Sequence, residues 1–223
     1  MCGKEVERPG RYVCSACVER LPFVPVTGCC RQCGRDAEGL TTEFLCEECR
    51  QSHPHFDRVA SVMRFTGELR EMVNAFKFRN HYWLSADFVD WLEALVKVRF
   101  KVGDIDIIVP MPITLRRRLD RGFNQCDYLG RLLARRLGKR YAPRALKRIN
   151  SPERQGGLSE SERRENVIGT FAVRQSDMIR NKTVLVVDDI MTTGSTLSEC
   201  AAELKRHGAE RVWAVTLART FRT

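Results

Sequence analysis

Residues 184–196 read VLVVDDIMTTGST, and this stretch decides the fold. Four apolar residues precede two adjacent carboxylates, and a loop of small residues then opens into a predicted helix over 195–207. A fully apolar strand is typical of a parallel sheet covered on both faces, and ligands bind such sheets at the carboxyl ends of the strands. We therefore expect residues 188–196 to lie at a ligand-binding edge.

The chemistry of this stretch favours a phosphorylated sugar. Asp188 and Asp189 are acceptors for the two vicinal hydroxyls of a ribose, and carboxylate oxygens also suit magnesium held against a pyrophosphate. The loop 192–196 offers backbone N–H groups and hydroxyls at the positive end of a helix, which suits a phosphate monoester. Gly194 allows the backbone to approach the ligand closely.

Two other folds contain a strand that ends in acidic residues. In a receiver domain that strand lies near the N-terminus and several βα units follow it, whereas only one helix and one strand, over 211–217, follow here. A nucleotide hydrolase requires a G-x4-G-K-[ST] phosphate loop, and the sequence contains none.

Length and charge narrow the function classes. The 223 residues, 43% of them hydrophobic, are enough for one sizeable core and a small appendage. Because no apolar run reaches the length of a signal peptide or a membrane helix, we expect a cytoplasmic protein without membrane insertion. The net charge of +10 favours a polyanionic partner, either a nucleic acid or a pyrophosphate-bearing metabolite, although such a charge also serves solubility alone.

The cysteines mark a domain boundary. Eight of the ten lie within residues 2–49, and metal binding explains them better than disulfides in a reducing cytosol. We therefore expect a Cys-rich zinc-ribbon region over 1–55 and a second domain over 56–223. Cys126 and Cys200 lie inside helical patterns and are interpreted as core residues.

Two C-x2-C pairs predict one structural zinc site. Cys30 and Cys33 form the first pair, and Cys46 and Cys49 form the second. Four thiolates at this spacing suit a tetrahedral zinc, and a site without an open position is structural rather than catalytic.

A second zinc site is one ligand short. Cys14 and Cys17 form a third pair, but the matching position holds only Cys2 followed by Gly3. An upstream residue, Cys29 or an exogenous ligand could complete the coordination sphere, and otherwise the site stays empty.

Arginines follow the predicted strand 105–109, within PMPITLRRRLDRGFNQ over 110–125. They are expected on the ligand-binding edge, although a charge run alone is more often a solvated face. The residues are Arg116, Arg117, Arg118 and Arg121. The segment 147–170 is polar with hardly any apolar periodicity, which predicts a functional flexible loop.

Residues 184–196 match the phosphoribosyl pyrophosphate (PRPP) motif of type I phosphoribosyltransferases, and nearly the whole chain resembles the ComF family. The resemblance implies an α/β type I phosphoribosyltransferase fold, with a mostly parallel sheet flanked by helices and a small N-terminal zinc-ribbon domain. It implies that Asp188 and Asp189 contact the ribose and act in catalysis. It also implies that the 5-phosphate is cradled by Thr192, Thr193, Gly194, Ser195 and Thr196.

The same resemblance extends to the arginine-rich stretch and the polar segment. The stretch that ends in R-G-F-N-Q at 121–125 resembles the loop that accepts pyrophosphate, and 147–171 resembles a loop that closes over it. Further contacts to PRPP are implied for Lys147, Arg148, Arg154 and Gln155. The chain departs from the family pattern at Cys2, where a complete C-x2-C pair is expected and only one cysteine, followed by Gly3, is present.

Two functions are expected from the resemblance. The first is a phosphoribosyltransferase that uses PRPP and magnesium with an unidentified acceptor, in a family associated with competence, DNA uptake and natural transformation. The alternative is a non-catalytic accessory protein that handles single-stranded DNA beside competence and DNA-processing proteins and uses the pocket as a ligand sensor. That role requires basic patches and stacking aromatics. The candidates, most of which core packing explains better, are Phe76, Phe78, Tyr82, Phe123 and Tyr128.

Overall fold

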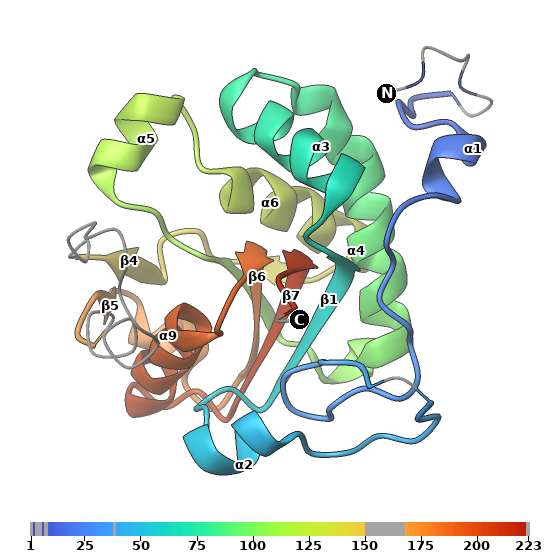
Figure 1. Ribbon diagram of the computed structural model, residues 1–223. Coiled ribbons are helices and arrows are strands. Elements are labelled where there is room, and N and C mark those ends of the chain that lie inside the picture. Colours follow the sequence, from blue (N-terminus) through green and yellow to red (C-terminus); the bar gives the residue numbers. More distant parts are fainter. Residues whose placement is uncertain (1, 3–5, 7–8, 38, 150–167, 222–223) are drawn as a thin grey trace.

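A five-stranded sheet forms the centre of the protein (Figure 1). The structure is a computed structural model that describes residues 2, 6, 9–37, 39–149 and 168–221. The strand order is β1-β7-β6-β2-β3, and every neighbouring pair runs parallel, which confirms the predicted α/β fold. The strands are β1 (Arg58–Arg64), β2 (Ile107–Pro110), β3 (Arg140–Tyr141), β6 (Thr183–Met191) and β7 (Arg211–Arg219).

The central strands are apolar along their length because both faces of the sheet are covered. In β6, Leu185 and Val187 join one buried cluster, whereas Val184 and Val186 join the other. This alternation follows from the two-residue period of a strand.

Three helices cover one face: α3 (Gly67–Phe78), α4 (Ser85–Arg99) and α6 (Gln125–Leu137). Their buried side chains meet Leu185 and Val187 in a single cluster. The 3-10 turns η1 (Tyr82–Leu84) and η2 (Val102–Asp104) stand before and after α4. The ends of α6 are fixed by local caps, because Asn124 accepts a hydrogen bond from the Cys126 N–H and Gly138 adopts φ 63°.

The other face is covered by α9 (Ser195–Arg206), with α2 (Glu47–Ser52) and α8 (Ser176–Ile179) contributing smaller contacts. Figure 1 shows α9 and α4 on opposite sides of the sheet. In the part of the chain that the structure describes, no helix combines the length and apolar character needed to cross a bilayer.

The Cys-rich segment packs on both faces around the free edge of β1. Val24 N–H donates to the Val62 carbonyl (2.9 Å), and Arg64 N–H donates to the Pro22 carbonyl (2.8 Å). Cys14 and Cys17, at the short helix α1 (Ser15–Val18), join the cluster of α3 and α4. The four cysteines from Cys30 to Cys49 join the cluster of α9. The segment therefore covers a strand edge that would otherwise be exposed.

The two polar stretches contain regular structure that was not predicted. The arginine-rich stretch is not a loop but contains a helix, α5 (Leu115–Arg121), which Thr114 caps by accepting a hydrogen bond from the Arg117 N–H. The predicted loop 147–171 is bounded by a short antiparallel ladder of β4 (Leu146–Arg148) and β5 (Phe171–Val173). Residues 150–167 lie outside the described residues.

Candidate functional site

The two adjacent acids lie inside β6 rather than after it. Past Pro110, where β2 ends, β6 continues beside β7 alone, and Asp188 pairs with Thr216. Both carboxylates are more than nine-tenths buried, yet both line a cavity of about 150 Å³ at the carboxyl edge of the sheet. The acids therefore face a cavity, as the sequence predicts, although they are more buried than a strand end would make them.

Asp189 is held by two side chains. Its Oδ2 lies 2.9 Å from Lys77 Nζ and accepts a hydrogen bond from Gln125 Nε2. Lys77 comes from the last turn of α3 and Gln125 from the first position of α6. Sequence reasoning missed both residues. Gln125 stood in the quoted R-G-F-N-Q, but Lys77 had no local signal, because only the packing of α3 brings it to β6.

Asp188 has weaker partners and a perturbed pKa. Its Oδ1 accepts a hydrogen bond from the Asp189 N–H (2.8 Å) and lies 3.4 Å from Cys126 Sγ. Burial, and then the charge of Asp189, raise the pKa of Asp188 to about 7. A carboxylate with this pKa gains from a bound cation or from hydroxyl donors, so the pair of acids fits magnesium or a diol.

The loop after β6 turns at a glycine. Gly194 has φ 83°, a conformation that other residues rarely adopt, and a Cβ there would lie 2.6 Å from Met191 Cε. Gly194 is the N-cap of α9 and offers no side chain to the first N–H groups of that helix. Those N–H groups suit an anion.

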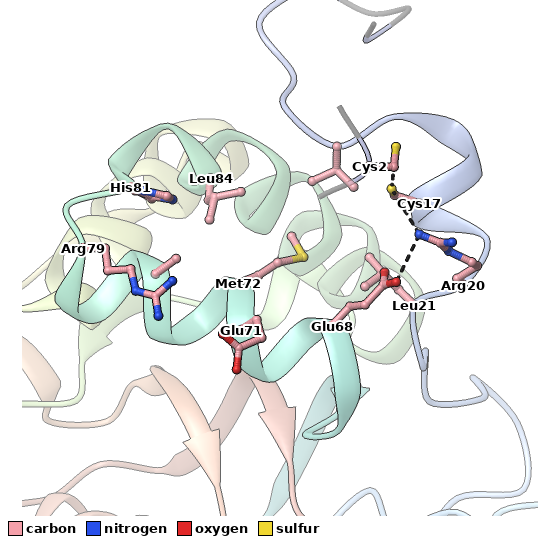
Figure 2. Close-up of a pocket in the computed structure, with 12 residues that line it drawn as sticks. Cys2, Cys17, Arg20, Leu21, Glu68, Glu71, Met72, Arg79, His81 and Leu84 are labelled. Atoms are coloured by element: carbon pink, nitrogen blue, oxygen red, sulfur yellow. Dashed lines mark hydrogen bonds and ion pairs between the residues drawn. The ribbon is translucent and has the colours of Figure 1, made fainter. Parts of the chain in front are cut away.

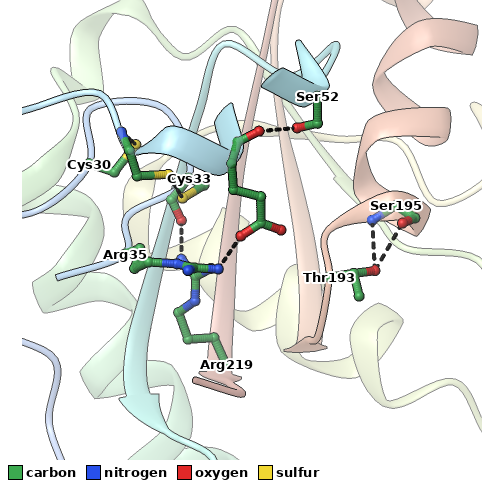
Figure 3. A network of polar contacts seen from close by, with 9 residues as sticks. Cys30, Cys33, Arg35, Ser52, Thr193, Ser195 and Arg219 are labelled. Atoms are coloured by element: carbon green, nitrogen blue, oxygen red, sulfur yellow. Dashed lines mark hydrogen bonds and ion pairs between the residues drawn. The ribbon is translucent and has the colours of Figure 1, made fainter. Parts of the chain in front are cut away.

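Some residues of the loop line the cavity, whereas two others form a hydrogen bond with each other. Thr192, Gly194 and Thr196 line the cavity. Thr193 Oγ1 and Ser195 Oγ lie 2.9 Å apart in a mutual hydrogen bond, visible in Figure 3. Among the predicted phosphate contacts, Thr193 and Ser195 are thus placed to stabilise the loop, and they do not line the cavity.

Three of the predicted basic residues line the cavity: Arg117 and Arg121 of α5, and Arg148 of β4. Arg117 and Arg121 are four residues apart and share one face of the helix. Arg116 and Arg118 are exposed, as is Lys147, whose side chain alternates with that of Arg148. Arg154 and Gln155, also predicted, lie outside the described residues.

The cationic side of the cavity carries closely spaced charges. Burial lowers the pKa of the Arg148 guanidinium, and the neighbouring charge of Arg117 lowers it further. Two guanidinium groups this close are favoured when an anion lies between them. The cavity thus has carboxylates at one side and guanidinium groups at another.

The four-cysteine knuckle, formed by Cys30, Cys33, Cys46 and Cys49, has the geometry of a zinc site. All four sulfurs lie within 4.8 Å of one another, and Cys33 Sγ lies 3.7 Å from Cys46 Sγ. A tetrahedral zinc with Zn–S bonds of about 2.3 Å requires sulfurs about 3.8 Å apart. All four side chains are buried, so the residues fit a closed structural zinc.

The three-cysteine group, formed by Cys2, Cys14 and Cys17, gathers on the opposite face. Cys2 Sγ lies 3.5 Å from Cys14 Sγ and 3.3 Å from Cys17 Sγ. Cys2 and Cys17 line a cavity of about 460 Å³ beside α3 (Figure 2). Cys29 lies outside this group, and its thiol donates to the Pro25 carbonyl (3.1 Å). Cys29 is therefore not the missing fourth ligand.

Comparisons with known proteins define the class first. Residues 125–221 match the phosphoribosyl transferase domain family. This range contains β6, the Gly194 turn and α9, so the fold is that of a type I phosphoribosyltransferase.

Full-length relatives define the family. The chain is 28% identical to Competence protein F of Haemophilus influenzae over 211 residues, which are 93% of this chain and 90% of that protein. It is 32% identical to DNA utilization protein YhgH of Salmonella typhimurium, over 94% of this chain and 91% of the relative. It is 26% identical to Competence protein ComFC of Bacillus subtilis, over 96% of this chain and 86% of that relative. The chain belongs to the ComF family.

Proposed function

We propose that the protein binds PRPP together with magnesium in the cavity at the carboxyl edge of β6. One observation carries the proposal: a single cavity joins two buried carboxylates, the Gly194 turn at the start of α9, and three arginines. PRPP carries a diol, a monophosphate and a pyrophosphate, and each of these groups has a chemically matched partner here. Asp188 and Asp189 would bind the diol and magnesium, and the turn would bind the 5-phosphate.

The arginines would bind the pyrophosphate. Arg117, Arg121 and Arg148 reach the cavity from two elements, α5 and β4. The cavity of about 150 Å³ is smaller than the ~300 Å³ or more of most ligand pockets. PRPP binding therefore requires side chains that line the cavity, such as Lys77 and Arg148, to move outward.

The same arrangement supports phosphoribosyl transfer. Arginines and magnesium would stabilise the departing pyrophosphate, while the ribose passes through an oxocarbenium-like state that a nucleophile of the acceptor attacks. The test is incubation of the protein with magnesium, PRPP and fractions of a metabolite extract, with pyrophosphate release as the readout. Pyrophosphate release that depends on one fraction places the acceptor in that fraction. If no fraction causes release, the protein binds PRPP without transferring its phosphoribosyl group.

A second role, in handling single-stranded DNA, is supported by exposed aromatic residues beside the cavity. Phe78 is 61% exposed, and the Arg121 guanidinium lies 4.8 Å from the centre of its ring. Tyr82 and Tyr128 are also exposed, whereas Phe76 is fully buried and belongs to the core. Exposed rings with arginines suit unpaired bases. The names of the relatives, which refer to competence and DNA utilization, agree with such a role.

The test of the DNA role uses the exposed arginines of α5 that do not line the cavity. Replacement of Arg116 and Arg118 by Ala should weaken binding of a single-stranded oligonucleotide and reduce its salt dependence, because fewer phosphate contacts release fewer counterions. PRPP binding should not change, since neither residue lines the cavity. Unchanged oligonucleotide binding would remove the DNA role.

We further propose that residues 1–55 are a zinc-stabilised unit attached to a phosphoribosyltransferase-like domain over 56–223. The four-cysteine knuckle and the three-cysteine group pack on opposite faces of the sheet. So short a segment depends on metal for part of its folding free energy.

A further inference from the structure

The four-cysteine knuckle and the turn that begins α9 belong to the same buried cluster. Cys30, Cys33, Cys46 and Cys49 share it with Phe56, Met191 and Leu197. Figure 3 shows Cys30 and Cys33 on one side of this region and Thr193 and Ser195 on the other. Phe56 follows the knuckle in sequence, and Met191 and Leu197 flank the Gly194 turn. The candidate zinc site and the turn are therefore connected by residues of this one cluster.

Gln32 ties the knuckle to the segment that follows it. This residue lies between the two thiols of the first C-x2-C pair, and its Nε2 donates to the carbonyl oxygens of Pro54 and Phe56, each at 3.0 Å. The Gln32 carbonyl accepts a hydrogen bond from the Val59 N–H (2.7 Å). A single knuckle residue thereby fixes the backbone over 54–59 at three points.

The fixed segment contacts the turn directly. The His55 N–H donates to Ser198 Oγ in the first turn of α9 (3.1 Å). The Phe56 ring is 3% exposed, and a Cβ built on Gly194 would lie 3.6 Å from it. Phe56 thus packs against Gly194 and is not among the residues that line the cavity.

We propose that Gln32 and Phe56 are positioning residues through which the four-cysteine zinc site holds the Gly194 turn in its anion-binding conformation. The functional consequence rests on the proposed binding of the 5-phosphate at that turn. Backbone N–H groups bind an anion well only when they are held within about 0.5 Å of the productive geometry. Bound zinc would restrict the motion of the knuckle. The hydrogen bonds from Gln32 to the Pro54 and Phe56 carbonyls would extend this restriction to Phe56. Phe56 packs against Gly194 and thereby limits the movement of the turn.

The first test separates the two ends of the ligand. Ribose 5-phosphate probes the turn together with the acids that bind its diol, whereas pyrophosphate with magnesium probes the acids and arginines without the turn. In the zinc-loaded Gln32→Leu protein, the affinity for ribose 5-phosphate should fall about tenfold, the equivalent of one to two hydrogen bonds, and the affinity for pyrophosphate should stay constant. Zinc content, measured by atomic absorption, should equal that of the wild type, because Gln32 is not a ligand.

Two substitutions of Phe56, one large and one small, form a matched pair of variants. Phe56→Ala should show the same selective loss, and the smaller change Phe56→Leu should restore most of the affinity. Phe100→Ala is the control, because Phe100 is equally buried (5% exposed) but packs against Trp213 at the start of β7. An equal loss for both ligands in Gln32→Leu, or the same loss in the Phe100 control, would overturn the proposal.

The second test needs no ligand, so it separates this inference from the proposed function. In the free protein, hydrogen exchange of the Ser198 N–H, which bonds to the Gly194 carbonyl (2.8 Å), should rise about tenfold in Gln32→Leu and on zinc removal by a chelator. The Tyr128 N–H holds the same place in α6, bonded to the Asn124 carbonyl (3.1 Å), and should not change. Unchanged exchange at Ser198, or an equal rise at Tyr128, would refute the coupling. A selective rise in a protein that binds no ribose 5-phosphate would refute only the proposed function.

Discussion

The two sides of the candidate site are built differently. The acidic side and the Gly194 turn come from one continuous stretch, residues 188–196, and their relative positions follow from a strand, a turn and a helix start. The basic side is assembled from Lys77 of α3, Arg117 and Arg121 of α5, and Arg148 of β4. The difference teaches that proximity along the chain brings the groups of one half of the site together, whereas only long-range packing brings together those of the other half.

A pair of glycines gives the strongest test of this difference. Gly194 and Gly122 both have positive φ, 83° and 77°, so alanine is strained at either position. A Cβ on Gly194 would force Met191 Cε to move, whereas a Cβ on Gly122 meets no atom within 4 Å. Gly194→Ala should lower PRPP affinity more than about 100-fold, because both the strain and the displacement act on the turn that binds the phosphate.

Gly122→Ala is the control for strain alone. It should cost about 1 kcal/mol of unfolding free energy and change PRPP affinity by less than about threefold, because α5 brings only flexible arginine side chains to the cavity. Urea unfolding and calorimetry provide the two measurements. If Gly122→Ala weakens PRPP binding as much as Gly194→Ala does, then the two sides are equally dependent on precise backbone geometry.

The arginines of α5 sharpen the comparison within the basic side. Arg117→Ala should weaken pyrophosphate binding about 30-fold, which is the effect of losing one charge-assisted contact to an anion. Arg116→Ala removes the same charge from an exposed side chain that does not line the cavity, so affinity should fall less than about twofold after salt screening. Equal effects would mean that α5 acts only through net charge.

A smaller effect is expected from pH, and it belongs to the acidic side. The pKa of Asp188 is about 7 against an ordinary value of 3.8, so the carboxyl is half protonated near neutral pH. Magnesium and ribose hydroxyls require the carboxylate, and affinity should therefore rise about tenfold from pH 6 to pH 8. Folding stability should respond in the opposite direction, because the raised pKa means that this group favours the folded state less as pH rises from 4 to 7.

The control for this pH effect is Asp188→Asn, measured over the same range. The 5-phosphate itself titrates near pH 6, and that contribution is common to both proteins. The groups that interact with Asp188 are Asp189, Lys77, Cys126, Arg148 and Cys200, and all remain in the variant. A pH profile that is unchanged by the substitution would assign the titration to the ligand.

The sequence was sufficient for the features that lie close together along the chain. The parallel sheet and the position of residues 188–196 at the carboxyl edge of the sheet were predictable, because apolar runs and a glycine turn are local signals. The pairing of Cys30 and Cys33 with Cys46 and Cys49 also followed from spacing alone.

The remaining features depend on tertiary contacts. Nothing in α3 distinguishes Lys77 from other lysines until the helix packs and brings it to Asp189. Arg117 and Arg121 line the cavity, and Arg116 and Arg118 do not, because these residues lie on the helix α5. The run of arginines gave no signal for this helix. The length of β6, which buries the acids, depends on its pairing with β7 beyond the end of β2.

The most direct measurement of the central claim is titration calorimetry of PRPP into the wild type and into Asp188→Asn/Asp189→Asn, each with and without magnesium. The wild type should bind one PRPP per chain in a magnesium-dependent manner, and the double variant should lose at least about 100-fold in affinity together with the magnesium dependence. Equal affinity in the two proteins, or binding that ignores magnesium in the wild type, would contradict the assignment of these two carboxylates to the ligand.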